Sequence, residues 1–180
     1  MARATCPFVD DFAEVAAEQA RWYAVYTCAN HEKRVAGQFG SRSVEHFLPQ
    51  YESVRRWKDR KVRLTLPLFP GYLFVHLAAK ERLRVLQVPG VVRLVGFNGS
   101  PTPVPEEDVH KIREFLGQGW RAEPYPYLQT GRRARVVRGA LAGMEGIVLR
   151  RKNRTRLVIS FDLIQRSMAV EIDQTNLAAI

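Results

Sequence analysis

A stretch rich in Gly and Pro, residues 117–127, separates two regions of the chain whose hydrophobic patterns differ. Residues such as Gly117, Pro124 and Pro126 interrupt helices and strands, so a cluster of them is typical of a connection between folded units. We therefore predict two domains joined by a linker. The predicted organisation is an N-terminal extension over 1–20, a first domain over 21–117, a linker over 118–129 and a second domain over 130–180.

The region before the linker alternates between strand patterns and helix patterns. Aromatic and β-branched residues, as in Trp22–Thr27, favour strands. The predicted fold of this region is α+β, with a mainly antiparallel sheet flanked by helices. Strands are predicted over 22–27, 45–56, 61–66, 68–77 and 91–97, and helices over 31–43, over 80–87 and from Pro105 onward.

Two of these helices have clear end signals. Asn30 suits the cap of the first helix. Pro105 suits the first position of the third helix, and acidic residues follow it where the helix dipole favours them. The apolar stripe predicted for the third helix consists of Val109, Ile112 and Leu116.

After the linker, only strand patterns occur. Short apolar and β-branched runs alternate with turns, and no sustained helical stripe is present in residues 131–180. Closely spaced short strands without helices between them are typical of a small all-β barrel. Its strands are predicted over 133–138, 147–151, 156–161 and 168–172.

The chain carries a net charge of +10, with 28 Lys and Arg residues against 18 Asp and Glu residues. A basic balance favours a polyanionic partner, usually a nucleic acid. Cys6 and Cys28 are the only cysteines and lie far apart, so we expect reduced thiols rather than a disulfide or zinc site. No apolar run reaches the ~18 residues of a membrane helix, and the acidic first twenty residues do not resemble a secretory signal. We predict a cytoplasmic protein.

Patterns typical of enzyme active sites are missing from the sequence. It contains no Gly-rich phosphate loop, no GxSxG motif and no HExxH motif. The four histidines are scattered and none is paired with a nucleophile by any sequence signature. We therefore predict a protein without enzymatic activity, bound metal or cofactor.

The strand that follows Pro70-Gly71 has two chemically different faces. Side chains alternate across a strand, so its aliphatic residues share one face and its aromatic residues share the other. The aliphatic face is expected to be core. The aromatic face suits either a docking surface for a partner helix or a second core layer under a helix. The two sets are Leu73, Val75 and Leu77 against Tyr72, Phe74 and His76.

Two groups of basic residues are candidates for contact with nucleic acid. One is the turn between two predicted strands, where Trp57 adds a stacking ring; a phosphate-contacting hairpin and an ordinary solvated turn both fit it. The other group begins the first helix. A third basic turn, residues 150–156, is interpreted as a solvated turn rather than an RNA site. The candidate residues are Arg55, Arg56, Lys58, Arg60 and Lys61 in the hairpin, and His31, Lys33 and Arg34 in the helix.

Two sequence blocks together resemble the NusG family of transcription elongation factors. The first pairs Arg21–Tyr26, read RWYAVY, with Leu68–Val75, read LFPGYLFV. The second is Gly131–Val148, which is similar to a KOW motif, with a basic strand, a Gly-rich turn and an apolar return strand. The resemblance covers residues 21–180. It implies a factor that binds RNA polymerase at the β′ clamp helices, near the β subunit, suppresses pausing and promotes antitermination.

The resemblance also implies which residues carry these contacts. It implies that the basic groups face the non-template DNA strand of the transcription bubble. It implies that the KOW turn binds a small-subunit ribosomal protein or Rho through Leu141 and Met144 as exposed apolar contacts, although housekeeping members usually carry aromatic residues there. The residues implied in polymerase binding are Tyr26, Phe69, Pro70 and Tyr72.

Three alternatives for the function stay open at this point. The Pro67–Val75 pattern, the compact basic hairpin and the altered KOW turn favour a specialised paralogue, similar to RfaH, that acts on a few long operons. A housekeeping factor that couples transcription to Rho or the ribosome is the second alternative. A ribosomal or other RNA-binding KOW protein is the third, but it does not explain the first sequence block.

Overall fold

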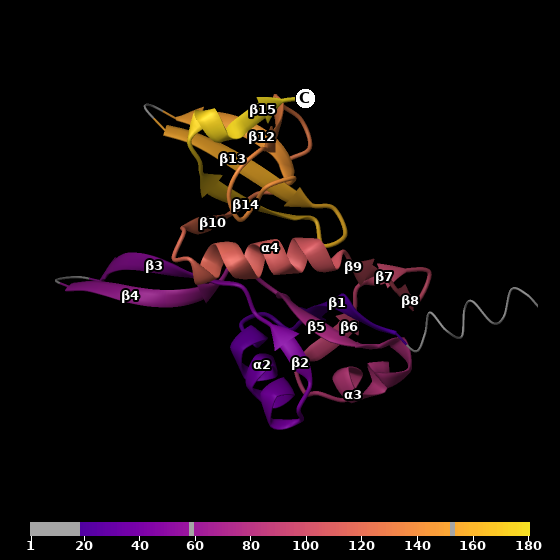
Figure 1. Cartoon of the computed structure of the whole chain (residues 1–180). Coiled ribbons are helices and arrows are strands. Elements are labelled where there is room, and N and C mark those ends of the chain that lie inside the picture. The colour runs from indigo at the N-terminus through magenta and orange to yellow at the C-terminus, as the bar shows by residue number, and fades with distance from the viewer. Residues whose placement is uncertain (1–18, 58–59, 152–153) are drawn as a thin grey trace, which may run out of the picture.

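The computed structural model describes residues 19–180 apart from residues 58–59 and 152–153 (Figure 1). The expected N-terminal extension therefore lies almost entirely outside the described residues, and so does Lys58. The described chain forms an α+β part followed by an all-β part, which confirms the predicted fold class. Helix α4 (Glu106–Gly117) lies between the two parts (Figure 1).

The first sheet is antiparallel and has β1 near its centre. Its strands follow the order β2-β5-β1-β6. Strand β9 pairs with Trp22 and Tyr23 of β1, ahead of the residues of β1 that pair with β6. The register places Tyr26 opposite Tyr72 at one end and Ala20 opposite Ala78 at the other. The strands are β1 (Ala20–Thr27), β2 (Glu45–Phe47), β5 (Tyr72–Ala78), β6 (Val91–Leu94) and β9 (Pro103–Val104).

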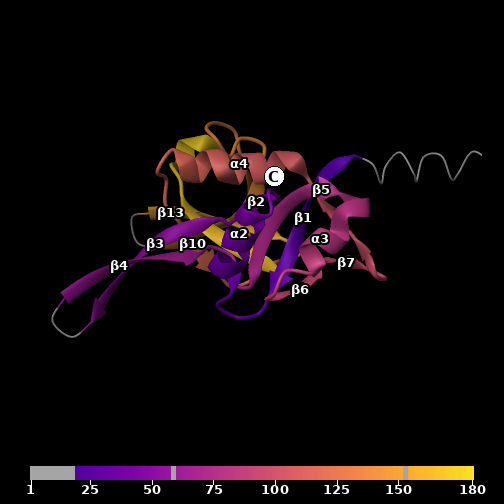
Figure 2. The same cartoon turned by 90° about the horizontal axis from the view of Figure 1, so that it is seen from below.

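Helices cover both faces of this sheet. On one face lie α2 (Glu32–Ser41), the short turn η1 (Ala79–Glu81) and α3 (Arg82–Leu86), as Figure 2 shows from below. Val35 and Phe39 of α2 are fully buried there. Helix α4 covers the opposite face (Figure 1). The sheet therefore separates two apolar clusters, and its central strands β1 and β5 contribute residues to both.

The alternation predicted for the strand after Gly71 is confirmed. Leu73 and Val75 pack on the side of α2 and α3, whereas Phe74 packs in the other cluster with Val109 and Ile112 of α4. Phe74 is 1% exposed, so for this ring the second core layer is the correct interpretation. Tyr72 stays half-buried at the start of the strand.

Both predicted helix ends differ from the structure by one position. His31, rather than Asn30, is the N-cap of α2 and makes no side-chain capping bond; Asn30 adopts a positive φ of 61° in the turn before it. Pro105 is the N-cap of α4 rather than its first residue. Phe115, which is 7% exposed, is the buried end of the stripe, and Leu116 packs beside it half-buried; positions 112 and 115 are as close on a helix face as positions 112 and 116.

Strands β3 (Gln50–Trp57) and β4 (Arg60–Pro67) form a two-stranded ribbon that extends away from the body (Figures 1 and 2). Its register pairs Gln50 with Pro67, and the N–H of Leu68 donates to the Pro49 carbonyl at 2.8 Å, which closes its base. A smaller hairpin, β7 (Gly96–Phe97) and β8 (Ser100–Pro101), turns at Asn98-Gly99.

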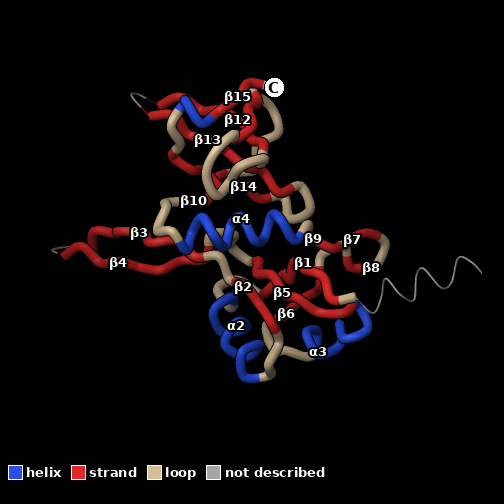
Figure 3. The backbone as a smooth tube through the Cα atoms, in the orientation of Figure 1, coloured by secondary structure: helices blue, strands red, loops and turns tan. Residues whose placement is uncertain are grey.

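The second sheet curls into the predicted barrel-like unit, with the strand order β10-β14-β13-β12-β11-β15 (Figure 3). Four strands were predicted within it, and β15 and the short turn η2 (Gln174–Asn176) were not. The range predicted as linker contains β10, which pairs with β14; the domain boundaries themselves stay predictions. The strands are β10 (Ala122–Tyr125), β11 (Arg133–Val136), β12 (Glu145–Arg151), β13 (Arg154–Phe161), β14 (Arg166–Glu171) and β15 (Leu177–Ala179).

We predict that Gly146→Ala destabilises the barrel. A Cβ added at Gly146 would lie 2.5 Å from the carbonyl oxygen of Val158, so strands β12 and β13 would have to separate. Overpacking of this kind costs about 1–3 kcal/mol, measured as the free energy of unfolding in urea. The matched control is Gly37→Ala in α2, where an added Cβ meets nothing within 4 Å. It should raise stability by about 0.5–1 kcal/mol, and equal effects of both variants would contradict the prediction.

Candidate interaction surfaces

The chain reverses direction tightly between residues 69 and 72. The N–H of Tyr72 donates to the carbonyl of Phe69 at 2.9 Å. Pro70 and Gly71 occupy the two central positions, and Gly71 has a φ of +85°. A proline followed by a residue with positive φ is the signature of a type II turn. The turn therefore requires the Pro-Gly pair for conformational reasons.

The structure brings the four residues implied in polymerase binding together around this turn. Tyr26 and Tyr72 are register partners on β1 and β5, and their ring centroids are 5.2 Å apart. Both rings are half-buried, and Pro70 is exposed. An added Cβ on Gly71 would lie 3.3 Å from Cε2 of Tyr26, so the turn packs closely on this ring. We define Tyr26, Phe69, Pro70 and Tyr72 as the turn patch.

Phe69 is the one member of the turn patch that is fully buried. Its ring meets Phe74 of the first part edge-on, with centroids 6.1 Å apart, and Phe161 of the barrel with centroids 5.2 Å apart. The barrel also places the guanidinium of Arg166 over the Tyr72 ring, 5.3 Å from its centroid. The barrel thus covers part of the turn patch.

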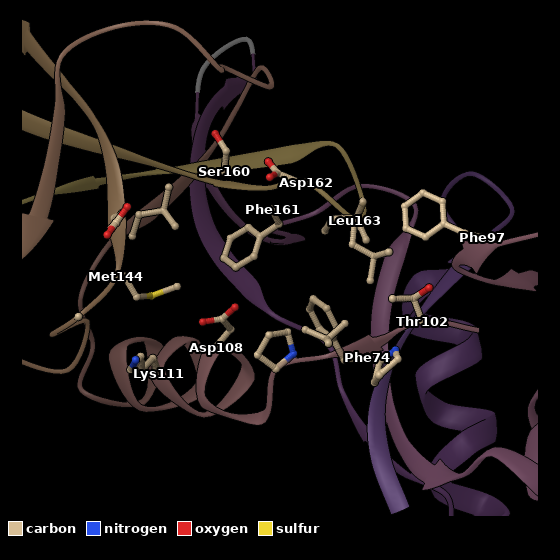
Figure 4. A pocket seen from close by; sticks show the side chains of 17 residues that line it. Phe74, Phe97, Thr102, Asp108, Lys111, Met144, Ser160, Phe161, Asp162 and Leu163 are labelled. Atoms are coloured by element: carbon tan, nitrogen blue, oxygen red, sulfur yellow. The ribbon is translucent and has the colours of Figure 1, made fainter. Parts of the chain in front are cut away.

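A cavity of about 510 Å³ lies beside this contact, between α4 and the barrel (Figure 4). Asp108 and Lys111 of α4 lie on one side, and Met144 and Phe161 lie on the other. Burial raises the pKa of the Asp108 carboxyl, while Lys111 acts in the opposite direction and Glu107 in the same direction. The interface between the two parts is therefore incompletely filled and holds a carboxyl group that is disfavoured in its charged form.

Leu141 and Met144 were expected to be exposed, and this expectation is wrong. They are 2% and 6% exposed and belong to the same apolar cluster as Phe69. The turn that carries them folds back on β11, where the N–H of Gly143 donates to Val136 at 2.8 Å and the N–H of Val136 donates to Met144 at 2.9 Å. These two hydrogen bonds hold the turn against β11, with the side chains of Leu141 and Met144 directed inward. The spacing of residues in the sequence does not reveal this.

The predicted basic hairpin is the β3–β4 ribbon. Its register places Arg56 opposite Lys61 and Val54 opposite Arg63, and Lys61 and Arg63 are exposed. Arg55 and Arg56 lie in β3 as predicted, Arg60 and Lys61 lie in β4, and Lys58 lies outside the described residues.

The second basic group splits into residues with different surroundings. Lys33 is exposed, and its ammonium donates to the carbonyl of Thr65 in β4 at 2.6 Å, so this cation lies against the ribbon. Arg34 is exposed. His31 is half-buried, and its Nδ1 is buried without a hydrogen-bond partner among the described residues. Because Lys33 joins the two groups, we define the α2 group and the ribbon together as the basic surface, to which His31 contributes least.

Sequence reasoning missed the residues of the barrel that contact the turn patch. Phe161 ends β13 and Arg166 begins β14, and neither has a sequence signal that links it to the distant Phe69–Tyr72 segment. Within the part of the chain that the structure describes, no group of three or more His, Cys, Asp or Glu residues is placed to hold a metal ion. None of the described helices is long and apolar enough to cross a membrane.

The described chain thus consists of an antiparallel sheet between helices, an aromatic turn patch and a following small barrel. The sequence model of the family described as "Transcription termination factor nusG" matches residues 20–113, more than half of the chain. The chain therefore belongs to the NusG family, and it is a transcription factor of that family.

Curated relatives agree with this assignment, and a solved structure agrees with the fold. The chain is 25% identical over 163 residues to the transcription termination/antitermination protein NusG of Helicobacter pylori, covering 84% of this chain and 87% of the relative. It is 29% identical over 168 residues to that of Staphylococcus aureus, covering 85% and 92%. The structure described as "Domain interaction in Thermotoga maritima NusG" has a TM-score of 0.60 and 20% identity, covering 91% and 99%. At that identity it supports the fold alone.

We predict that Phe161→Ala loosens the contact between the barrel and the turn patch. An edge-to-face aromatic pair contributes about 1 kcal/mol, so the separated population should rise about fivefold. Hydrogen–deuterium exchange of the segment around Tyr72 should accelerate accordingly. Phe97→Ala is the matched control, because that ring is 70% exposed and lines the same cavity. Unchanged exchange in Phe161→Ala would show that the contact does not hold the parts together.

Proposed function

We propose that this NusG-family factor acts on RNA polymerase during elongation, docking on the β′ clamp helices through the turn patch and promoting read-through of pauses and terminators. The observation that carries this proposal is the gathering of Tyr26, Phe69, Pro70 and Tyr72 at one tight turn. Aromatic rings with few rotatable bonds are well suited to anchor a protein interface. The proposed role is binding without enzymatic chemistry.

The contact between Phe69 and Phe161 adds a condition to this proposal. A ring that is fully buried under the barrel is not accessible to a clamp helix. We infer that docking on polymerase requires the barrel to separate from the turn patch. The 510 Å³ cavity supports a separable interface, because unfilled space reduces the free energy gained by closing it.

The basic surface of α2 and the ribbon is proposed to contact the non-template DNA strand. The ribbon extends away from the body, which leaves it accessible while the turn patch is occupied (Figure 1). Exposed Lys61 and Arg63 of β4 and exposed Arg34 of α2 supply the cations. Lys33 belongs to the same surface, although its ammonium already donates to Thr65.

Two further proposals concern the type of paralogue and the partner of the barrel. We favour a specialised factor for long operons, because the turn at Leu141 and Met144 lacks the aromatic residues usual in housekeeping members. A sole homologue encoded beside ribosomal-protein genes would contradict this. Because both residues are buried, binding of Rho or a small-subunit ribosomal protein at this turn would require it to open or the barrel to separate.

The docking proposal predicts that Phe69→Leu weakens polymerase binding about tenfold, because interface aromatic residues dominate binding free energy. The assay is single-round transcription with the cognate polymerase, on a template with a strong pause and a terminator, together with a binding titration. Wild type should shorten the pause and increase read-through, and Phe69→Leu should not. Phe161→Ala should bind more tightly than wild type.

The matched control for this experiment is Val85→Ala. Val85 is also fully buried, but it lies on α3 in the cluster on the far side of the sheet, so it reports the general cost of shortening a core side chain. Equal losses in both variants would mean that Phe69 acts through stability alone. A wild-type protein that neither binds the polymerase nor changes the transcripts would reject the proposed function.

For the basic surface, we predict that the double variant Lys61→Gln, Arg63→Gln weakens binding to single-stranded DNA. Two lost phosphate contacts should reduce the slope of log K against log salt by about 1.4, or about 0.7 for each contact. Arg82→Gln, Arg121→Gln removes two exposed charges outside the ribbon and should leave the slope unchanged. The same change of slope in both double variants would indicate an unlocalised charge effect.

A further inference from the structure

The turn patch is tied to helix α2 by a buried carboxylate. Glu32, the first residue of α2, is 5% exposed, and its Oε1 accepts a hydrogen bond from the N–H of Gly71 at 2.7 Å. The two residues are far apart in the sequence, so this contact is decided by the tertiary fold. It is a side-chain bond to the centre of the turn that carries Phe69, Pro70 and Tyr72.

The geometry of the turn explains why this bond matters. The turn's own hydrogen bond uses the Phe69 carbonyl and the Tyr72 N–H. The Gly71 carbonyl accepts from the N–H of Thr27 at 2.9 Å. The Gly71 N–H has no part in either bond, and an unpaired buried N–H is costly. The carboxylate of Glu32 satisfies it with a charge-assisted bond, which is stronger than a neutral one.

The carboxylate is itself held in place by its helix. Val35 and Phe39 of α2 are fully buried against the first sheet, so α2 is a fixed support rather than a mobile arm. Glu32 also lies in the first turn of α2, where the helix dipole favours a negative charge. An anchored helix, a buried acceptor and an otherwise unpaired donor together restrict the turn to one conformation.

A general preference for acids at helix starts does not account for this arrangement. Glu106 occupies the same first position in α4, yet it is exposed, and no hydrogen bond of its side chain is found among the described residues. Glu32 differs because it is buried and directed at another element.

We propose that Glu32 is the positioning residue of the turn patch: it fixes the Phe69–Tyr72 turn in the conformation that docks, without touching the partner. This inference rests on the proposed function, because it assigns a role within the same surface. A preorganised turn binds with higher affinity, because it loses less conformational entropy when the partner binds. Loss of the bond should therefore weaken docking even though every residue of the turn patch is retained.

The test uses the full chain and three variants: Glu32→Ala, Glu32→Gln and, as the matched control, Glu106→Ala. Glu32→Ala should reduce polymerase affinity about tenfold, because a hydrogen bond to a charged group is lost. Glu32→Gln keeps an oxygen acceptor and should stay within about threefold of wild type. Glu106→Ala should bind like wild type, since it removes only a charge from a helix start.

A second measurement separates this inference from the proposed function. Hydrogen exchange of the Gly71 amide should accelerate about tenfold in Glu32→Ala, with little change in Glu32→Gln or Glu106→Ala. If wild type does not bind polymerase, the proposed function fails, and the exchange data alone decide whether Glu32 fixes the turn. If wild type binds and Glu32→Ala binds equally well, or Glu32→Gln is as weak as Glu32→Ala, the positioning role is overturned.

Discussion

The pairing of β1 with β5 is the interaction on which the rest of the structure depends. It runs from the pair of Ala20 with Ala78 to the pair of Tyr26 with Tyr72. The two side chains of each pair lie on the same face of the sheet. One face receives α2 and α3, and the other receives α4. Because the pairing ends at Tyr72, the tight turn before β5 must lie beside the ring of Tyr26. The site of the turn patch is therefore a consequence of strand register.

The second sheet covers part of the turn patch. The barrel and a binding partner would therefore compete for the same surface. The ring of Phe69 is buried between Phe74 and Phe161. A partner that binds this ring must therefore replace its contact with Phe161. A partner displaces the barrel only when the free energy of binding the partner is more favourable than the free energy of the contact with the barrel. The cavity beside it reduces the advantage of the closed arrangement.

The ribbon and α2 connect the two proposed surfaces. Lys33 bonds to Thr65 of β4, and the preceding residue Glu32 bonds to Gly71. One helical turn therefore contacts both the base of the basic ribbon and the centre of the turn patch. Helix α2 is itself anchored in the core through Val35 and Phe39.

The sequence by itself determined the fold class, the family resemblance, most strands and the alternation in β5, because these follow from local periodicity and from short motifs such as FPGY. It did not reveal β10 or β15, which are short strands whose pairing partners lie far along the chain. Only the tertiary structure decided that Phe69, Leu141 and Met144 are buried and that Glu32 bonds to Gly71. Burial and such bonds depend on which distant segments come together, and local residue patterns carry no information about that.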